Sequence, residues 1–151
     1  MSGPFRLRAG GLIDRGRPLT FRFDGRPLSG YAGDTLASAL LGAGVRLVGR
    51  SFKYHRPRGI VTAGPEEPNA LVERMTRYGR EPNVPATMID LSEGLVVDSQ
   101  NRWPSLDRDI GAINGLFSRF LGAGFYYKTF MAPSSWWERR FEPAIRRAAG
   151  L

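Results

Sequence analysis

The chain has 151 residues, which suits one domain with its own hydrophobic core, or a domain with an extension. Its 22 basic and 14 acidic side chains give a formal net charge of +8, which favours anionic partners: nucleic acid, nucleotide phosphates, carboxylates or an acidic protein surface. The absence of cysteine excludes disulfides, thiolate zinc sites and cysteine-ligated iron–sulfur clusters. Because no apolar run approaches the roughly 20 residues of a membrane span and the N-terminus lacks the apolar core of a signal peptide, we expect no membrane span and a cytoplasmic location.

The first predicted elements form an antiparallel hairpin. The dipeptide Asp24-Gly25 is the strongest hairpin signal of the chain. The segment before it alternates, so that its two phenylalanines would face one way. We therefore expect Leu19–Phe23 to pair with Arg26–Tyr31.

A short helix is predicted to follow. Either Asp34 or Thr35 can accept hydrogen bonds from the amides of its first turn, and Gly44 is placed to end it in a left-handed cap. The apolar residues that would share one face are Leu36, Leu40 and Ala43. We expect Val45–Val48 to form a short buried strand after this helix.

Residues 59–70 are rich in Gly, Pro and Glu and indicate an irregular loop. Three candidate strands come after it, with a turn at Glu93-Gly94: Leu71–Met75, Ala86–Leu91 and Leu95–Asp98. Hairpin, helix and strand in this order predict an α+β fold of the β-grasp type, in which a mixed sheet wraps one helix. We place this domain at residues 1–99.

Residues 100–151 are predicted to form a helical extension that is rich in aromatic residues. Asp107 or Asp109 can cap a first helix, whose apolar stripe would be Ile110, Ile113, Phe117 and Phe120, ended by Gly122 and Gly124. Ser134 or Ser135 can cap a second helix, with a break at Pro143 and with Trp137, Phe141 and Ile145 on one face. The aromatic run at residues 125–131 lies between the two helices. This segment is too apolar to stand alone, so it packs either on the β-grasp domain or on protein outside this chain.

The stretch Arg50–Gly59 holds four fixed positive charges and the single histidine of the chain. Such a run is commonly a solvated face, but it can also hold an anion. Candidate residues for binding a nucleotide or flavin phosphate are Arg50, Lys53, His55 and Arg58. Two aromatic residues in the stretch, Phe52 and Tyr54, could stack on nucleic-acid bases; we prefer an extended segment with both rings in the core.

Familiar catalytic motifs are absent from the sequence: the nucleophile elbow, the phosphate-binding P-loop, the HExxH pair and the GxGxxG fingerprint. Glu66 and Glu67 are adjacent carboxylates, and neighbours on a loop diverge. We interpret them as two solvated or salt-bridged acids and expect no complete active site and no metal site in this chain.

Several long blocks resemble the N-terminal region of the alpha subunit of heterotetrameric sarcosine oxidase. They are Gly33–Leu41, Gly49–Gly59, Ser99–Leu106, Ala123–Met131 and Glu142–Leu151. The resemblance implies an N-terminal piece of a longer subunit in which a dinucleotide-binding domain follows. Since Leu151 falls inside one of these blocks, we expect a truncated or split subunit.

The resemblance further implies oxidative demethylation of sarcosine to glycine, with peroxide formation and transfer of the one-carbon unit to tetrahydrofolate. FAD, FMN, NAD and tetrahydrofolate would be bound by the full complex and none by this chain alone. The implied partners are the rest of the alpha subunit and the beta, gamma and delta subunits. We therefore expect a structural or docking role, with phosphate binding by Arg50–Gly59 as the alternative and single-stranded nucleic-acid binding last.

The same region resembles plant-type [2Fe–2S] ferredoxin domains, which agrees with the predicted β-grasp order. Related dehydrogenase subunits carry a C-x4-C-x2-C run after a Pro-Arg-Gly, and a fourth cysteine in a later strand. The corresponding positions here are Thr62, Glu67, Ala70 and, for the fourth, Thr87. None of these residues supplies a thiolate, so the resemblance implies a domain of this fold without its cluster.

Overall fold

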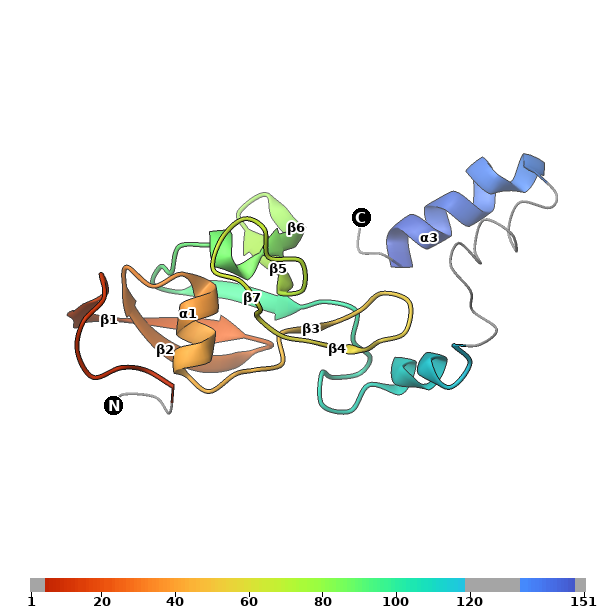
Figure 1. Ribbon diagram of the computed structural model, residues 1–151. Helices are drawn as coiled ribbons and strands as arrows, with labels where there is room; N and C mark the ends of the chain where they lie inside the picture. The colour runs from red at the N-terminus through yellow and green to blue at the C-terminus, as the bar shows by residue number, and fades with distance from the viewer. Residues whose placement is uncertain (1–4, 119–133, 149–151) are drawn as a thin grey trace.

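A computed structural model describes residues 5–118 and 134–148 of the chain (Figure 1). Strands β1 (Asp14–Phe23) and β2 (Arg26–Ala32) form the predicted antiparallel hairpin. Asp24 and Gly25 both have positive φ, 49° and 74°, as a two-residue turn matched to the strand twist requires. The hairpin prediction is confirmed. The sequence could predict it because the turn residues determine the register of the two strands locally.

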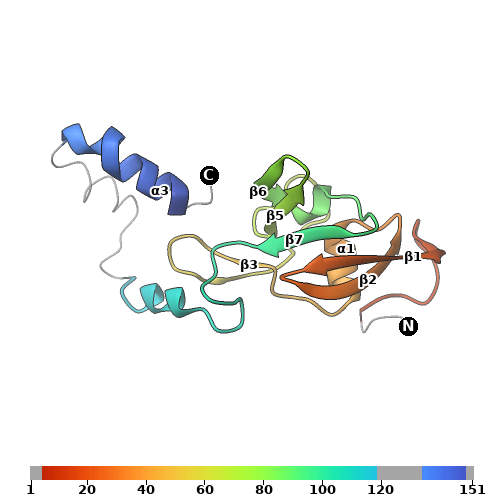
Figure 2. The same ribbon diagram turned by 180° about the vertical axis from the view of Figure 1, so that it is seen from behind.

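Five strands form one mixed sheet in the order β2-β1-β7-β5-β6. Strand β7 (Leu95–Ser99) runs parallel to β1 and antiparallel to β5 (Leu71–Thr76), and β6 (Gly79–Pro85) is the far edge strand. The helix α1 (Leu36–Gly42) covers one face of this sheet; it lies in front of β1 and β2 in Figure 1 and behind them in Figure 2. This is the α+β, β-grasp arrangement that the sequence predicts.

Helix α1 begins and ends as expected. The Thr35 hydroxyl is its N-cap and accepts a hydrogen bond from the Ser38 amide at 3.2 Å. Asp34 is buried beside the cap, where its carboxylate accepts from the Tyr31 amide at 2.9 Å and from the Ser38 hydroxyl at 2.7 Å. After the C-cap, Gly44 has φ +87°, the left-handed conformation in which glycine is preferred.

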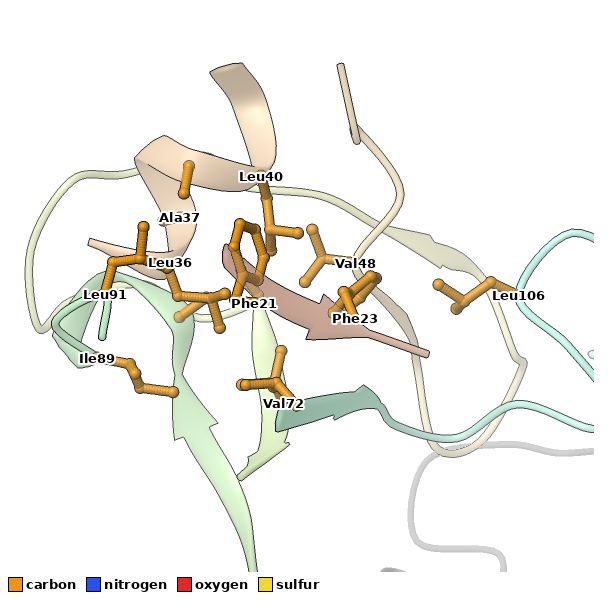
Figure 3. Close-up of a cluster of buried hydrophobic side chains, with 14 residues drawn as sticks. Phe21, Phe23, Leu36, Ala37, Leu40, Val48, Val72, Ile89, Leu91 and Leu106 are labelled. Atoms are coloured by element: carbon orange, nitrogen blue, oxygen red, sulfur yellow. The ribbon is translucent and has the colours of Figure 1, made fainter. Parts of the chain in front are cut away.

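The hydrophobic core lies between α1 and the sheet (Figure 3). Phe21 and Leu40, from β1 and α1, are 1% and 0% exposed. Leu106 comes from beyond the last strand and still belongs to this cluster; Figure 3 shows it beside Phe23. The core therefore includes a residue of the predicted extension.

Two strand predictions are wrong. Val45–Val48 is irregular: Val48 is fully buried, but the strand that follows is β3 (Gly49–Arg50), paired with β4 (Pro57–Arg58) in a separate two-stranded sheet. Ala86–Leu91 opens with a 3₁₀ turn, η1 (Ala86–Met88). Ala86 and Ile89 are both buried, and their spacing of three residues suits that turn, in which residues i and i+3 lie on the same side.

Strand β6 is not predicted by the sequence. This edge strand carries Arg80, Glu81, Pro82 and Asn83, so it lacks the apolar alternation by which strands are recognised. Arg80 and Glu81 instead pair with side chains of β5: Arg80 with Glu73 at 3.0 Å, and Glu81 with Arg74 at 2.5 Å.

Helical segments follow the sheet, as predicted. The 3₁₀ helix η2 (Ile110–Gly115) is capped by Asp109, whose carboxylate accepts from the Gly111 amide at 3.2 Å. Further along lie η3 (Ser134–Trp136), the π-helix η4 (Trp137–Phe141) and α3 (Glu142–Ala148), so Pro143 lies at the junction where the π-helix passes into α3. The predictions for Phe120, Gly122, Gly124 and residues 125–131 fall outside the described residues. Within the described ranges, no helix is long and apolar enough to cross a membrane.

Candidate functional site

The basic stretch forms a short hairpin and its loop. Residues 51–56 connect β3 to β4, and Ser51 closes the loop: its carbonyl accepts from the His55 amide and its amide donates to the Arg56 carbonyl, both at 2.9 Å. His55 has φ +52°, in the left-handed region. The extended segment that we expected is therefore wrong, and so is the core position of its rings: Phe52 is 45% exposed on a turn.

Arg50 points into the protein and does not face solvent. Its Nε and Nη2 donate to the Leu106 carbonyl at 2.9 and 2.5 Å, and Nη1 donates to the His55 carbonyl at 2.8 Å. Its Nε also lies 3.4 Å from Oδ2 of Asp109, and the side chain is only 10% exposed. These contacts tie the β3–β4 hairpin to the segment that enters η2.

His55 and Asp109 form a hydrogen-bonded pair. Nδ1 of His55 lies 2.8 Å from Oδ2 of Asp109, whose side chain is fully buried. The other oxygen, Oδ1, accepts from the Trp103 and Gly111 amides at 2.8 and 3.2 Å. Asp109 thus satisfies a histidine and two backbone amides while it also contacts Arg50, which makes it the centre of the network. The sequence identified it only as a possible helix cap.

The other candidate residues lie apart from this pair. Lys53 Nζ and Arg56 Cζ lie 4.9 and 4.8 Å from the centre of the Tyr54 ring. Arg58 donates from Nη1 to the side-chain oxygen of Asn69. The structure therefore brings Arg50 and His55 together and places Lys53 and Arg58 in separate contacts.

A second cluster lies in the loop that follows β4, around Glu67. This side chain is buried, and its Oε2 accepts from the amides of Val61 and Thr62 at 2.9 and 2.7 Å and from the Thr62 hydroxyl at 3.1 Å. Its Oε1 accepts from the amides of Asn69 and Ala70 at 2.8 and 3.0 Å. Our interpretation of Glu67 as a solvated or salt-bridged acid is therefore wrong: its partners are backbone amides, which side-chain patterns do not reveal.

Hydrogen bonds from backbone amides keep the Glu67 carboxyl group ionised. Burial raises the pKa of this carboxyl, but hydrogen bonds from four backbone amides outweigh burial and bring the pKa from 4.5 to about 2. Glu67 is therefore a carboxylate throughout the physiological pH range. Its charge is stabilised by oriented N–H dipoles, as in other anion-binding nests of backbone.

The four positions that resemblance relates to cluster ligands do not fit an iron–sulfur cluster. Thr62, Glu67 and Ala70 all belong to the carboxylate network, and Thr87 is buried and donates to the Gly64 carbonyl at 2.7 Å. No cysteine is available to ligate iron, so the chain binds no cysteine-ligated cluster here. Across residues 5–118 and 134–148, no three His, Cys, Asp or Glu side chains group so that they could hold a metal ion.

Comparison with known proteins gives consistent matches. The family described as "2Fe-2S iron-sulfur cluster binding domain" matches residues 16–102. Sarcosine oxidase subunit alpha of Rhizobium meliloti (strain 1021) is 68% identical over 148 residues, which are 97% of this chain and 15% of that protein. The subunit of the same name from Corynebacterium sp. (strain U-96) is 45% identical over 102 residues, 63% of this chain and 11% of that protein.

Among solved structures, L-proline dehydrogenase from P. horikoshii matches with a TM-score of 0.48 and 26% identity, over 60% of this chain and 17% of that one. The resemblance to the N-terminal region of sarcosine oxidase alpha subunits is confirmed by the sequence matches. The chain spans less than a fifth of the length of these curated relatives.

Proposed function

From the premise that the chain belongs to the family of 2Fe–2S iron–sulfur cluster binding domains, we propose that it is the N-terminal structural and docking part of a sarcosine oxidase alpha subunit. In this proposal the full complex demethylates sarcosine to glycine, forms peroxide and transfers the one-carbon unit to tetrahydrofolate. FAD, FMN, NAD and the folate are held by other parts of the complex, and the chain has no activity alone. The absence of cysteine supports a role other than electron relay through a cluster.

One observation carries the docking role: the apolar face of η2 and the residues just after it is exposed. The exposed fractions of its large side chains are 58% for Ile110, 54% for Ile113, 81% for Leu116 and 53% for Phe117. Four large apolar residues within eight positions form a patch of the kind that marks protein–protein contact. We call these four residues the η2 face.

The occupant we propose for the η2 face is the remainder of the alpha subunit. The aligned region is only 15% of the Rhizobium meliloti subunit, so most of such a subunit is available as a partner. The network of Arg50, His55 and Asp109 supports this choice, because it fixes the start of η2 against the β-grasp domain and so presents the face in one orientation.

The test is assembly of a full-length alpha subunit that carries Leu116→Glu, co-expressed with the other subunits. We expect at least about a fivefold loss of assembled complex by size-exclusion chromatography, because a charge would be buried in an apolar contact. The matched control is Leu12→Glu at another exposed leucine, which should assemble normally. Normal assembly of the Leu116 variant would overturn the docking role. Sarcosine-dependent peroxide production by the 151-residue chain alone would overturn its inactivity.

The alternative is phosphate binding by the loop Arg50–Gly59, favoured by the two cations that lie on the Tyr54 ring. Titration of FMN, FAD and NAD into the chain tests it, with Arg56→Ala as the variant and Arg77→Ala as the control. Arg77 also lies on a tyrosine ring, 4.6 Å from the centre of Tyr78, but on the β5–β6 turn. Equal binding by both variants, or no binding by the chain, would eliminate this alternative.

A further inference from the structure

The loop around Glu67 contains an anion-binding site that is occupied by the carboxylate of Glu67 itself. Five donors from two short segments, Val61-Thr62 and Asn69-Ala70, converge on the two carboxylate oxygens at 2.7 to 3.1 Å. We propose that this loop is an anion-binding nest in which the Glu67 carboxylate replaces the anionic cluster for which its family is named. The nest would accept a small carboxylate, such as formate, if the Glu67 side chain were removed.

Four backbone amides of this loop converge on one place. Backbone N–H groups that are buried without an acceptor cost free energy, so a loop that points four of them at one place needs an anion or several acceptors there. Glu67 is 3% exposed, and none of the ion pairs that the described residues form involves it. Amide dipoles and the Thr62 hydroxyl therefore provide the countercharge that a basic side chain would otherwise supply.

The loop lies within the part of the chain that matches the family. The family match covers residues 16–102, and the positions related to cluster ligands include Thr62, Glu67 and Ala70, all of which take part in the nest. An iron–sulfur cluster held by thiolates is anionic, and hydrogen bonds to its sulfurs tune it. A carboxylate supplies negative charge and hydrogen-bond acceptors, but it needs neither metal nor thiol. The family is described as binding an iron–sulfur cluster, whereas this chain lacks the cysteines that would hold one. The proposal explains this difference, because the Glu67 carboxylate takes the place of the anionic cluster.

Side-chain hydrogen bonds support the loop at its two flanks. Arg58 Nη1 donates to the Asn69 side-chain oxygen, and the Thr87 hydroxyl donates to the Gly64 carbonyl at 2.7 Å. These bonds do not involve the carboxylate, so they should keep the loop close to its shape when Glu67 is shortened. The nest is therefore expected to persist as an open site in the Glu67→Ala variant of the 151-residue chain.

The experiment measures hydrogen exchange of the amides of Val61, Thr62, Asn69 and Ala70 by NMR. In Glu67→Ala we expect exchange of these amides to rise about tenfold or more, because they lose their acceptor. Sodium formate at about 100 mM should restore at least half of the lost protection, measured at constant ionic strength against sodium chloride. The matched control is Glu66→Ala, at an exposed neighbour, which should change neither protection nor its response to formate.

Unchanged exchange in Glu67→Ala, or rescue by chloride or formamide equal to that by formate, would overturn the proposal. If Glu67→Ala does not fold, the test becomes refolding in formate against chloride, followed by circular dichroism, and refolding to the same extent in both would count against it. The isosteric variant Glu67→Gln provides a second readout, because its NH₂ group must face one pair of amides. We expect exchange to rise at one pair only, and wild-type protection at all four amides would also overturn the proposal. None of these outcomes depends on whether the η2 face docks.

Discussion

The imidazole of His55 lies directly over the backbone of Gly111. A Cβ atom built on Gly111 would come within 2.3 Å of His55 Cε1, far inside van der Waals contact. The histidine ring is therefore held between the Asp109 carboxylate and a position that must have no side chain. This packing joins the β3–β4 loop to η2 across more than 50 residues of sequence.

Gly111→Ala should displace His55 and weaken the whole network. We expect a loss of about 1–3 kcal/mol in the free energy of unfolding, measured by urea denaturation. Gly115→Ala is the matched control in the same helix, because its Cβ would lie 3.9 Å from the nearest atom, an ordinary contact. If the two variants were equally stable, the packing of His55 on Gly111 would be unimportant.

Asp109→Asn should remove the buried negative charge and leave the shape of the side chain unchanged. Oδ1 would still accept from the Trp103 amide, but an NH₂ group would face the Arg50 guanidinium, so we expect a loss of about 2–4 kcal/mol by urea denaturation. Asp107→Asn changes an exposed carboxylate two residues away and should stay within about 0.5 kcal/mol of the wild type. A loss of similar size in both variants would indicate a general charge effect.

Glu67 should make the free energy of unfolding depend on pH in the acid range. Its folded pKa of about 2 lies below the ordinary value of 4.5, so its contribution is fully present above pH 4.5 and is lost as the pH falls toward 2. The contribution is on the order of 2 kcal/mol once solvent screening is allowed for. Urea midpoints measured from pH 7 to pH 2 should converge for the wild type and Glu67→Gln at the acid end, whereas parallel curves would contradict this prediction.

Arg6 should stabilise the N-terminal segment against α1. Its Nη2 lies 2.8 Å from Oδ2 of Asp34, and the two side chains are 9% and 1% exposed. Burial raises the pKa of Asp34, but hydrogen bonds from Arg6, Ser38 and Tyr31 together lower it below its ordinary value.

Arg6→Ala would leave the Asp34 carboxylate buried without its cation. We expect a loss of about 1–3 kcal/mol by urea denaturation and faster proteolysis at residues 5–13. The control, Arg8→Ala, changes an exposed arginine and should behave like the wild type. Unchanged proteolysis in Arg6→Ala would show that other contacts hold the segment.

Local signals predicted much of the fold. The turn at Asp24-Gly25, the cap at Thr35 and the left-handed Gly44 are each determined by a few neighbouring residues, and all three are present. Strand β6 could not be found in this way, since an exposed edge strand needs no apolar alternation.

The candidate site was less predictable because its contacts are long-range or involve the backbone. Nothing near His55 in sequence indicates Asp109, and nothing in the residue types around Glu67 indicates that four amides point at its carboxylate. The density of charge in Arg50–Gly59 indicated an important segment, but it suggested an outward-facing anion site, whereas Arg50 turns inward.

The position of Leu106 bears on how a shorter version of this protein could be made. A fragment ended after Ser99 would lose a core side chain, the carbonyl that accepts two bonds from Arg50, and the aspartate that holds His55. The smallest soluble fragment suited to NMR or crystallisation should therefore extend at least through Gly111, although the last strand of the sheet ends twelve residues earlier.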